Sequence, residues 1–338
     1  MAGTVLVTGG TGYIATYLIR QLLDEGWTVH TTIRSLKRET DLRMRLDANE
    51  TRLNVFQADL MNDSGWAEAC AECSHIAHVA SPIPTTAPKD ENDLIVPARE
   101  GALRALKFGK AAGVKRVVLT SSMAAVGYGV DRGEHHFNES NWTDINHADA
   151  YPYVKSKTIA ERAARDWMAE NGGDMEFCTV NPGMVLGPVT DPDFSASVEV
   201  IKQLLDGSLP AAPDMGFPIV DVRDVADLHV RALTAPDMNG ERFLAAGKFM
   251  KFIEIAAVLR ERMGQKARKA PTRKMPDFIL KALALFNGEI RGVLSELGKI
   301  RHADSSHAKN KLGWMTRPEE DSIVETAESL IAHGVVKV

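Results

Sequence analysis

A strand that leads directly into a glycine turn constrains the fold of this chain most strongly. Thr4–Thr8 is an apolar, β-branched run, Gly9–Gly12 follows it, and Tyr13–Leu23 has the apolar spacing of a helix. Glycines let the turn close and let backbone N–H groups approach a phosphate, and the N-terminus of the helix adds partial positive charge. The small Ala15 lets helix and strand pack closely. The T-G-x-x-G-x-x-A spacing is modest alone, but between a strand and a helix it favours a dinucleotide site over an ordinary turn.

Apolar runs and helix-like segments alternate through the first half of the chain, which predicts an α/β fold with a doubly wound parallel sheet, a Rossmann fold. The predicted strands are Thr4–Thr8, Thr28–Ile33, Leu53–Gln57, His75–Ala80, Arg116–Ser121, Phe177–Asn181 and Arg242–Ala246, and the predicted helices include Leu94–Gly109, Thr158–Asn171, Val222–Ala235 and Phe252–Met263. Beyond Pro182, prolines break the chain into short pieces. We therefore expect a cofactor domain over residues 1–182 plus about 222–246, and a smaller, mostly C-terminal substrate-binding region over 183–221 and 247–338.

Composition narrows the classes of function. The 338 residues are 44% hydrophobic and carry a net charge of −5, so we expect neither nucleic acid nor a membrane as partner. The three cysteines favour a reducing compartment, and we expect a cytoplasmic protein. Cys70 and Cys73, followed by His75 and His78, resemble a zinc ligand set, but the two histidines belong to a predicted buried strand. We predict no metal site.

A tyrosine and a lysine four residues apart lie on one face of a helix, where the ammonium can lower the pKa of the phenol toward the range useful for proton transfer. Tyr151-Pro-Tyr153-Val-Lys155-Ser-Lys157 contains two such pairs. Pro152 disfavours helical backbone at Tyr151, so the pair Tyr153/Lys157 is the better candidate.

With these residues in view, the chain resembles the extended short-chain dehydrogenases/reductases, and among them the dihydroflavonol 4-reductase, cinnamoyl-CoA reductase and aldehyde reductase group. The resemblance rests on segments that occur in the family's order over roughly the first 190 residues: Thr8–Ala15, His78–Pro82, Val118–Ser122, Glu139–Trp142, Tyr153–Lys157 with Ala160-Glu161, and Asn181–Gly183. Each segment is weak alone, and together they are specific.

The resemblance implies NADPH-dependent reduction of an aldehyde or ketone to an alcohol. Tyr153 would donate the proton, Ser122 (or Ser121 as the fallback) would hold the carbonyl oxygen, and Lys157 would tune the tyrosine and hold the nicotinamide ribose. The substrate would be a small carbonyl compound.

The end of the second predicted strand indicates which nicotinamide cofactor is used. NAD-binding proteins carry an acidic residue there, whereas this chain has Arg34 and then Lys37, cations that suit the 2′-phosphate of NADP. The resemblance places further cofactor contacts after the other strands: Gly9, Thr11, Gly12, Tyr13, Ile14, Asp59, Leu60, Val79, Ala80, Ser81, Thr120, Pro182, Gly183 and Val185.

Two departures and two alternatives stay open at this point. Arg104 stands where the family usually carries an asparagine, and Gly127 stands where plant flavonoid reductases carry another, so a flavonoid substrate is not implied. A nucleotide-sugar epimerase or dehydratase shares the fold, and so does a non-catalytic NADP-sensing protein. We expect residues 127–150 and 184–217 to shape the pocket, the latter as an apolar cover over the nicotinamide. The protein is expected to be a monomer or a homodimer.

Overall fold

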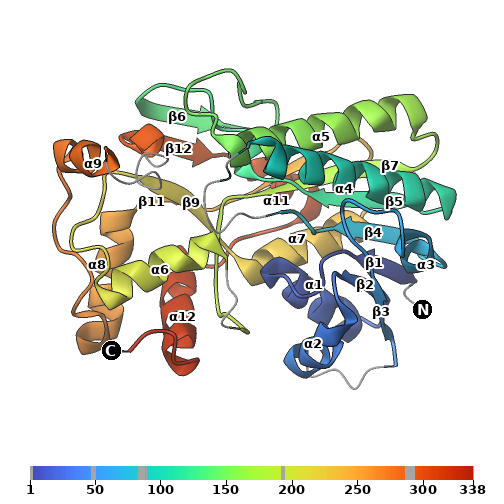
Figure 1. Ribbon diagram of the computed structural model, residues 1–338, viewed down its shortest axis with the longest axis horizontal. Helices are drawn as coiled ribbons and strands as arrows, with labels where there is room; N and C mark the ends of the chain where they lie inside the picture. Colours follow the sequence, from blue (N-terminus) through green and yellow to red (C-terminus); the bar gives the residue numbers. More distant parts are fainter. Residues whose placement is uncertain are drawn as a thin grey trace.

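The computed structural model describes residues 3–46, 51–82, 88, 90–191, 195–285 and 294–337. Its centre is a seven-stranded sheet in the order β3-β2-β1-β4-β5-β7-β10, in which every neighbouring pair is parallel (Figure 1). The strands are β1 (Thr4–Val7), β2 (Thr28–Ile33), β3 (Leu53–Gln57), β4 (His75–His78), β5 (Arg116–Thr120), β7 (Glu176–Pro182) and β10 (Arg242–Ala245). This is the doubly wound sheet that the alternating pattern predicts.

Helices cover both faces of this sheet, because successive side chains of each strand point to opposite faces. Val5 and Val7 pack with α1 (Tyr13–Asp24) and α7 (Val222–Thr234) in one core. Leu6, between them, packs in a second core on the other face. The helices of that face are α3 (Trp66–Cys70), α4 (Asn92–Ala111) and α5 (Pro152–Asn171), and α4 and α5 run side by side in Figure 1.

The chain reverses its direction of travel across the sheet after β3. It winds outward from β1 through β2 to β3, then returns to place β4 on the other side of β1. Ligands of such sheets bind outside the carboxyl ends of the strands at this switch point. The glycine turn lies there, directly after β1.

A smaller region lies at the other end of the molecule in Figure 1, built on a three-stranded sheet in the order β11-β9-β8. Its elements are β8 (Met184–Leu186), α6 (Ala196–Asp206), β9 (Gly216–Asp221), β11 (Phe249–Lys251), α8 (Phe252–Met263) and α12 (Glu319–Ala332). Separately, β6 (Gly133–Phe137) pairs in parallel with β12 (Lys299–Ala303) in a two-stranded sheet. Among the described residues, the other α-helices are α2 (Glu39–Leu46), α9 (Asp277–Ala284) and α11 (Ser306–Leu312).

The boundaries of most predicted elements agree with the structure to within a few residues; Thr28–Ile33, Leu53–Gln57 and Phe252–Met263 agree at both ends. The helix predicted from Thr158 begins six residues earlier, at Pro152. Proline is well suited to the first position of a helix because its fixed φ is already helical. In the described part of the chain, no helix has both the length and the apolar character to cross a membrane.

Candidate active site

The glycine turn is closed by backbone hydrogen bonds and leaves no room for a side chain at Gly9 or Gly10. The N–H of Gly12 donates to the carbonyl of Gly9 at 2.8 Å, and Gly9 has a φ of +72°. A Cβ at Gly9 would lie 3.0 Å from the Cβ of Ala80, and one at Gly10 would lie 2.3 Å from Oγ1 of Thr31. Helix α1 then begins without a side-chain hydrogen bond at its N-cap and without an acidic residue in its first turn. The turn is therefore shaped for a group that backbone N–H groups and a helix dipole can bind, such as a phosphate.

The ends of β1 and β4 are fastened together beside this turn. The hydroxyl oxygen of Thr8 accepts hydrogen bonds from the backbone N–H groups of Val79 and Ala80, both at 3.0 Å, and lies 2.9 Å from Nδ1 of His78. Burial, with a contribution from Lys157, lowers the pKa of His78 to about 3, so this imidazole is neutral at physiological pH. The segment from Val79 to Ser81 is thereby held against the glycine turn.

The predicted NADP-selecting cations lie after β2. Arg34 follows the strand directly and is exposed, and Lys37 is exposed in the short 3₁₀ turn Leu36–Arg38. Within the described ranges, neither has an ion-pair partner, whereas the neighbouring Arg38 lies 4.0 Å from a carboxylate oxygen of Asp191. Arg34 and Lys37 are therefore available to a ligand anion.

Asp59 and Leu60 follow β3, and α4 holds them in place. Nη1 of Arg104 donates to the carbonyl of Leu60 at 2.7 Å, and a Cβ at Gly101 would lie 2.6 Å from Cδ2 of Leu60. Arg104, flagged as a departure from the family pattern, thus joins α4 to the loop after β3. Pro182 ends β7, and the N–H of Gly183 donates to the carbonyl of Ala245 at 3.0 Å. Val185 is buried in β8.

Ser122 and Tyr153 meet at the carboxyl end of β5. Tyr151 is the extended N-cap of α5, so Tyr153 and Lys157 fall in the first two turns of that helix, on one face. The Ser122 hydroxyl is hydrogen-bonded to the Tyr153 phenol, and it also accepts from the N–H of Ala124 at 3.1 Å. Lys157 is buried, and its ammonium donates to the carbonyl of Thr120 at 3.4 Å.

The pKa of Tyr153 differs from the sequence-based expectation. Burial raises it, and the hydrogen bond with Ser122 offsets only part of that rise. The depression expected from Lys157 is not present: burial and Ser122 are the groups that shift the pKa of Tyr153. Burial lowers the pKa of Lys157 itself to about 8, although the Glu161 carboxylate counteracts this. The phenol is therefore protonated at neutral pH.

The structure separates the competing pair, Tyr151 and Lys155. The ammonium of Lys155 lies 2.7 Å from a carboxylate oxygen of Glu91. The Tyr151 ring contacts the Tyr128 ring edge-on at a centroid distance of 5.8 Å, and burial raises its pKa. No common site forms from these two side chains.

Ser121, the fallback for Ser122, belongs to a buried polar network that the sequence did not reveal. Its hydroxyl donates to Glu161 at 2.5 Å, and Glu161 also accepts from Nε of Arg242 at 2.7 Å and from Asn181 at 2.8 Å. The Arg242 guanidinium lies 3.9 Å from the centre of the Trp142 ring. Glu161 was part of the family pattern, but its partner could be found only from the pairing of β10 with β7.

A second buried cluster of charged side chains lies next to Tyr128, the ring that Tyr151 contacts, and the sequence did not predict it. Nζ of Lys299 lies 2.6 Å from Asp149, and Nη1 of Arg301 lies 2.7 Å from Glu296. Arg301 also lies over the Tyr128 ring, at 4.1 Å. The other carboxylate oxygen of Glu296 is buried without a hydrogen-bond partner among the described residues, and burial raises the pKa of this group. About 150 residues separate the two sides of the cluster, so no local pattern indicated it.

Two small pockets lie near the carboxyl edge of the sheet, and neither is lined by Ser122 or Tyr153. The first is lined by residues from β4, β5 and α5 and the loops that follow the strands, among them His78, Ala80, Ser81, Thr120, Ser121 and Lys157. The second lies between the glycine turn and the loop after β8. The Tyr13 and Tyr17 hydroxyls donate to the carbonyls of Gly187 and Pro188 at 2.7 and 2.8 Å, which ties that loop to α1.

The expectation that residues 184–217 form an apolar cover over the nicotinamide is wrong in part. Met184, Leu186, Leu204 and Leu205 are buried in the core of the smaller region, where they pack with α8 and α12. Their apolar character is explained by that core and does not indicate an apolar substrate. Residues 192–194, which include another apolar residue of this stretch, lie outside the described residues.

Comparison with known proteins places this arrangement in context. Residues 5–246 match the NAD dependent epimerase/dehydratase family. The chain is 35% identical over 268 residues to cinnamoyl-CoA reductase CAD2 of Medicago truncatula, covering 77% of this chain and 81% of that protein. It is 30% identical over 269 residues to dihydroflavonol 4-reductase of Hordeum vulgare, covering 77% and 75%. Yeast methylglyoxal/isovaleraldehyde reductase Gre2, solved with NADPH, shares the fold with a TM-score of 0.82 at 24% identity, over 98% of this chain and 100% of that one.

Proposed function

Because this chain belongs to the NAD dependent epimerase/dehydratase family, and within it to the group of cinnamoyl-CoA and dihydroflavonol reductases, we propose that it reduces an aldehyde or ketone to an alcohol with NADPH. The relatives are named as reductases, and the similar yeast structure holds NADPH; both facts support an NADP-dependent oxidoreductase. The observation that carries the proposal is the meeting of Ser122 and Tyr153 beside the buried Lys157.

The residues at the carboxyl edge fit a dinucleotide with a 2′-phosphate. A side chain at Gly9 would press against Ala80, so the turn admits only glycine there. The first turn of α1 has neither a side-chain cap nor an acidic residue. Arg34 and Lys37 are exposed cations where an NAD-binding protein would carry an acid. We propose that the glycine turn holds the pyrophosphate and that Arg34 and Lys37 hold the phosphate. When bound, NADPH supplies the hydride that a carbonyl carbon accepts.

Three side chains have distinct tasks in this proposal. Tyr153 donates a proton to the carbonyl oxygen, and its raised pKa keeps the phenol protonated until the substrate oxygen becomes basic. Ser122 donates a hydrogen bond to the same oxygen. Lys157, whose pKa is about 8, remains largely cationic at neutral pH and would hold the nicotinamide ribose when the cofactor is bound.

The two regions of the fold have different binding roles in this proposal. We propose that residues 1–182 with about 222–246 bind the cofactor, and that residues 183–221 and 247–338 bind the substrate. The partner is a small carbonyl compound that enters beside Ser122 and Tyr153.

A panel of aromatic and aliphatic aldehydes and ketones tests this function, with NADPH oxidation followed at the nicotinamide absorbance. We expect turnover of at least one class of carbonyl, and faster turnover with NADPH than with NADH. UDP- and GDP-sugars serve as the comparison set. Conversion of a nucleotide sugar, with no carbonyl in the panel reduced, would contradict the proposal.

A further inference from the structure

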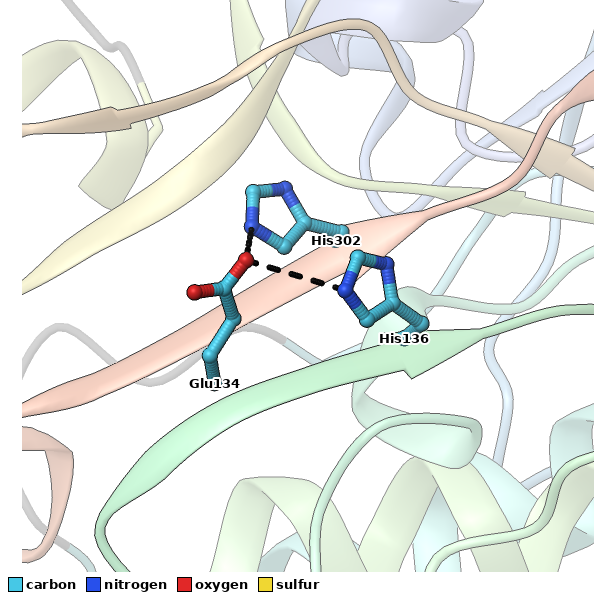
Figure 2. A group of neighbouring side chains, drawn as sticks. All are labelled: Glu134, His136 and His302. Atoms are coloured by element: carbon cyan, nitrogen blue, oxygen red, sulfur yellow. Dashed lines mark hydrogen bonds and ion pairs between the residues drawn. The ribbon is translucent and has the colours of Figure 1, made fainter.

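We propose that Glu134, His136 and His302 form a binding site for a divalent transition-metal ion of the Zn²⁺ class. Figure 2 shows the three side chains converging between β6 and β12, with the Glu134 carboxylate facing both imidazoles. Neither the predicted cofactor residues nor the proposed proton donor is among them.

Strand geometry brings the three side chains together. Glu134 and His136 are two residues apart in β6, so they point to the same face of that strand. In the parallel ladder, His302 of β12 is the register partner of His136. The two imidazole rings stack at a centroid distance of 4.7 Å and an interplanar angle of 18°. The site is thus set by backbone pairing, which fixes the spacing of its ligands.

The separations between ligand atoms match those around a small tetrahedral ion. Oε1 of Glu134 lies 3.0 Å from Nε2 of His302 and 3.6 Å from Nε2 of His136, and all three ligand atoms lie within 4.8 Å of one another. Zinc binds imidazole nitrogen and carboxylate oxygen at about 2.0–2.2 Å, which with tetrahedral angles places neighbouring ligand atoms about 3.3–3.6 Å apart. The two carboxylate–imidazole separations span this range. For both Nε2 lone pairs to point at one ion, the imidazole rings must also turn out of their near-parallel stacking.

The donor set also selects the class of ion. Two imidazoles and one carboxylate suit Zn²⁺, Ni²⁺ and Cu²⁺, whereas Mg²⁺ and Ca²⁺ prefer oxygen ligands. The side chains of His136 and Glu134 are 75% and 59% exposed, so the ion can enter from solvent and keep water in its remaining coordination position.

The ion would fasten two distant parts of the chain. β6 precedes the helix that carries Tyr153, and β12 belongs to the C-terminal part. On the other face of β12, Lys299 and Arg301 reach the buried Asp149 cluster. A metal bound across β6 and β12 would therefore stabilise the folded protein, because it binds a geometry that the unfolded chain lacks.

The test is a calorimetric titration of the full-length, tag-free protein, freed of metal by a chelator, with ZnCl₂. We expect one zinc per chain with micromolar affinity, loss of at least tenfold in affinity for His136→Ala and for His302→Ala, and no binding of Mg²⁺. Saturating zinc should raise Tm by roughly 5 °C in the unmodified protein and not in those two variants.

His135 provides a matched control on the same strand. It points to the opposite face, where its Nε2 lies 3.0 Å from the carbonyl oxygen of Asp131. His135→Ala should bind zinc like the unmodified protein. The site is refuted by absence of zinc binding, by unchanged binding in the His136 and His302 variants, or by equal loss in the His135 variant. The circular dichroism spectrum and Tm of each variant are also measured without metal. If both match the unmodified protein, misfolding is excluded as the cause of a loss of zinc binding.

Discussion

Tyr153 and Tyr151 lie two residues apart, and the structure gives them different partners. Tyr153 is hydrogen-bonded to Ser122, while Tyr151 packs against Tyr128. Replacing Tyr153 by Phe keeps the ring and removes the acidic proton. We expect the turnover number to fall by about two orders of magnitude or more, since general acid catalysis contributes about 10²–10⁴-fold. The measurement is kcat for NADPH oxidation with a turned-over carbonyl.

Tyr151→Phe is the matched control for this change. It removes a hydroxyl of the same kind from the N-cap position of the same helix, and we expect a mild effect on kcat. NADPH should still bind to both variants. If Tyr151→Phe is the more damaging substitution, the assignment of the proton donor is wrong.

We propose that Arg34 selects NADPH over NADH. It is exposed and, as far as the described residues go, lacks an ion-pair partner, so Arg34→Gln removes little besides its contact with the ligand. Loss of a charge-assisted hydrogen bond to phosphate costs about 1.5–3 kcal/mol, so NADPH affinity should weaken about tenfold to a hundredfold. Fluorescence titration with both cofactors measures this, and NADH, which lacks the phosphate, is the internal control. Equal affinity of the unmodified protein for both cofactors would refute the role of Arg34.

At the scale of the elements, the buried pair Glu161–Arg242 joins α5 to β10. Burial alone would raise the pKa of Glu161, but Arg242 and Arg165 bring it below its usual range. Glu161→Gln would leave the Arg242 guanidinium buried without its counter-charge, and breaking such a pair costs about 3–5 kcal/mol. We expect that loss in the free energy of unfolding, measured with urea. Adding Arg242→Met to Glu161→Gln should recover part of it; a double variant as unstable as the sum of the singles would contradict this account.

Buried histidines make the stability of the central sheet depend on pH. His229 of α7 donates from Nδ1 to the carbonyl of Val225 at 2.8 Å, and its Nε2 accepts from the Thr120 hydroxyl at the end of β5 at 2.7 Å. Burial lowers the pKa of His229 to about 4. The pKa of a histidine in an unfolded chain is about 6.5. Between these values the unfolded chain binds more protons, so the free energy of unfolding falls as the pH falls from 6.5 toward 4.

The variant His229→Gln isolates this contribution, because the other titrating groups are shared with the unmodified protein. We expect its free energy of unfolding to depend less steeply on pH in that window, by up to about 1.4 kcal/mol per pH unit. Urea unfolding at several pH values gives both slopes. Identical slopes would show that His229 is not a buried neutral group.

The sequence predicted elements well and their distant partners poorly. The strands of the central sheet were readable because each is a compact apolar run, and the position of Tyr153 in its helix followed from Pro152. Partners such as Arg242 for Glu161 depend on which strands become neighbours, and local patterns carry no information on that. The pairing of β6 with β12, and with it the His136–His302 contact, was hidden for the same reason. The apolar stretch after Pro182 was predicted to cover the nicotinamide, but part of it packs in the core of the smaller region. An apolar run in a sequence does not indicate whether it faces a pocket or a core.

On the scale of the whole molecule, one edge of one sheet collects the residues expected to bind cofactor and to transfer the proton. The glycine turn follows β1, Arg34 follows β2, and Ser122 follows β5, so a ligand extended along this edge would reach all three. If Arg34 selects NADP as we propose, the arrangement suits a cofactor that is released after each reduction, because cells keep NADP reduced.

The stoichiometry of the reaction tests this central claim most directly. The purified protein is given a carbonyl substrate and NADPH, and the alcohol formed and the NADPH consumed are both quantified. We predict that they are equal, because each carbonyl takes up one hydride and one proton. Product formation from a nucleotide sugar without net loss of NADPH, by a protein that is purified with tightly bound NAD⁺, would contradict the account.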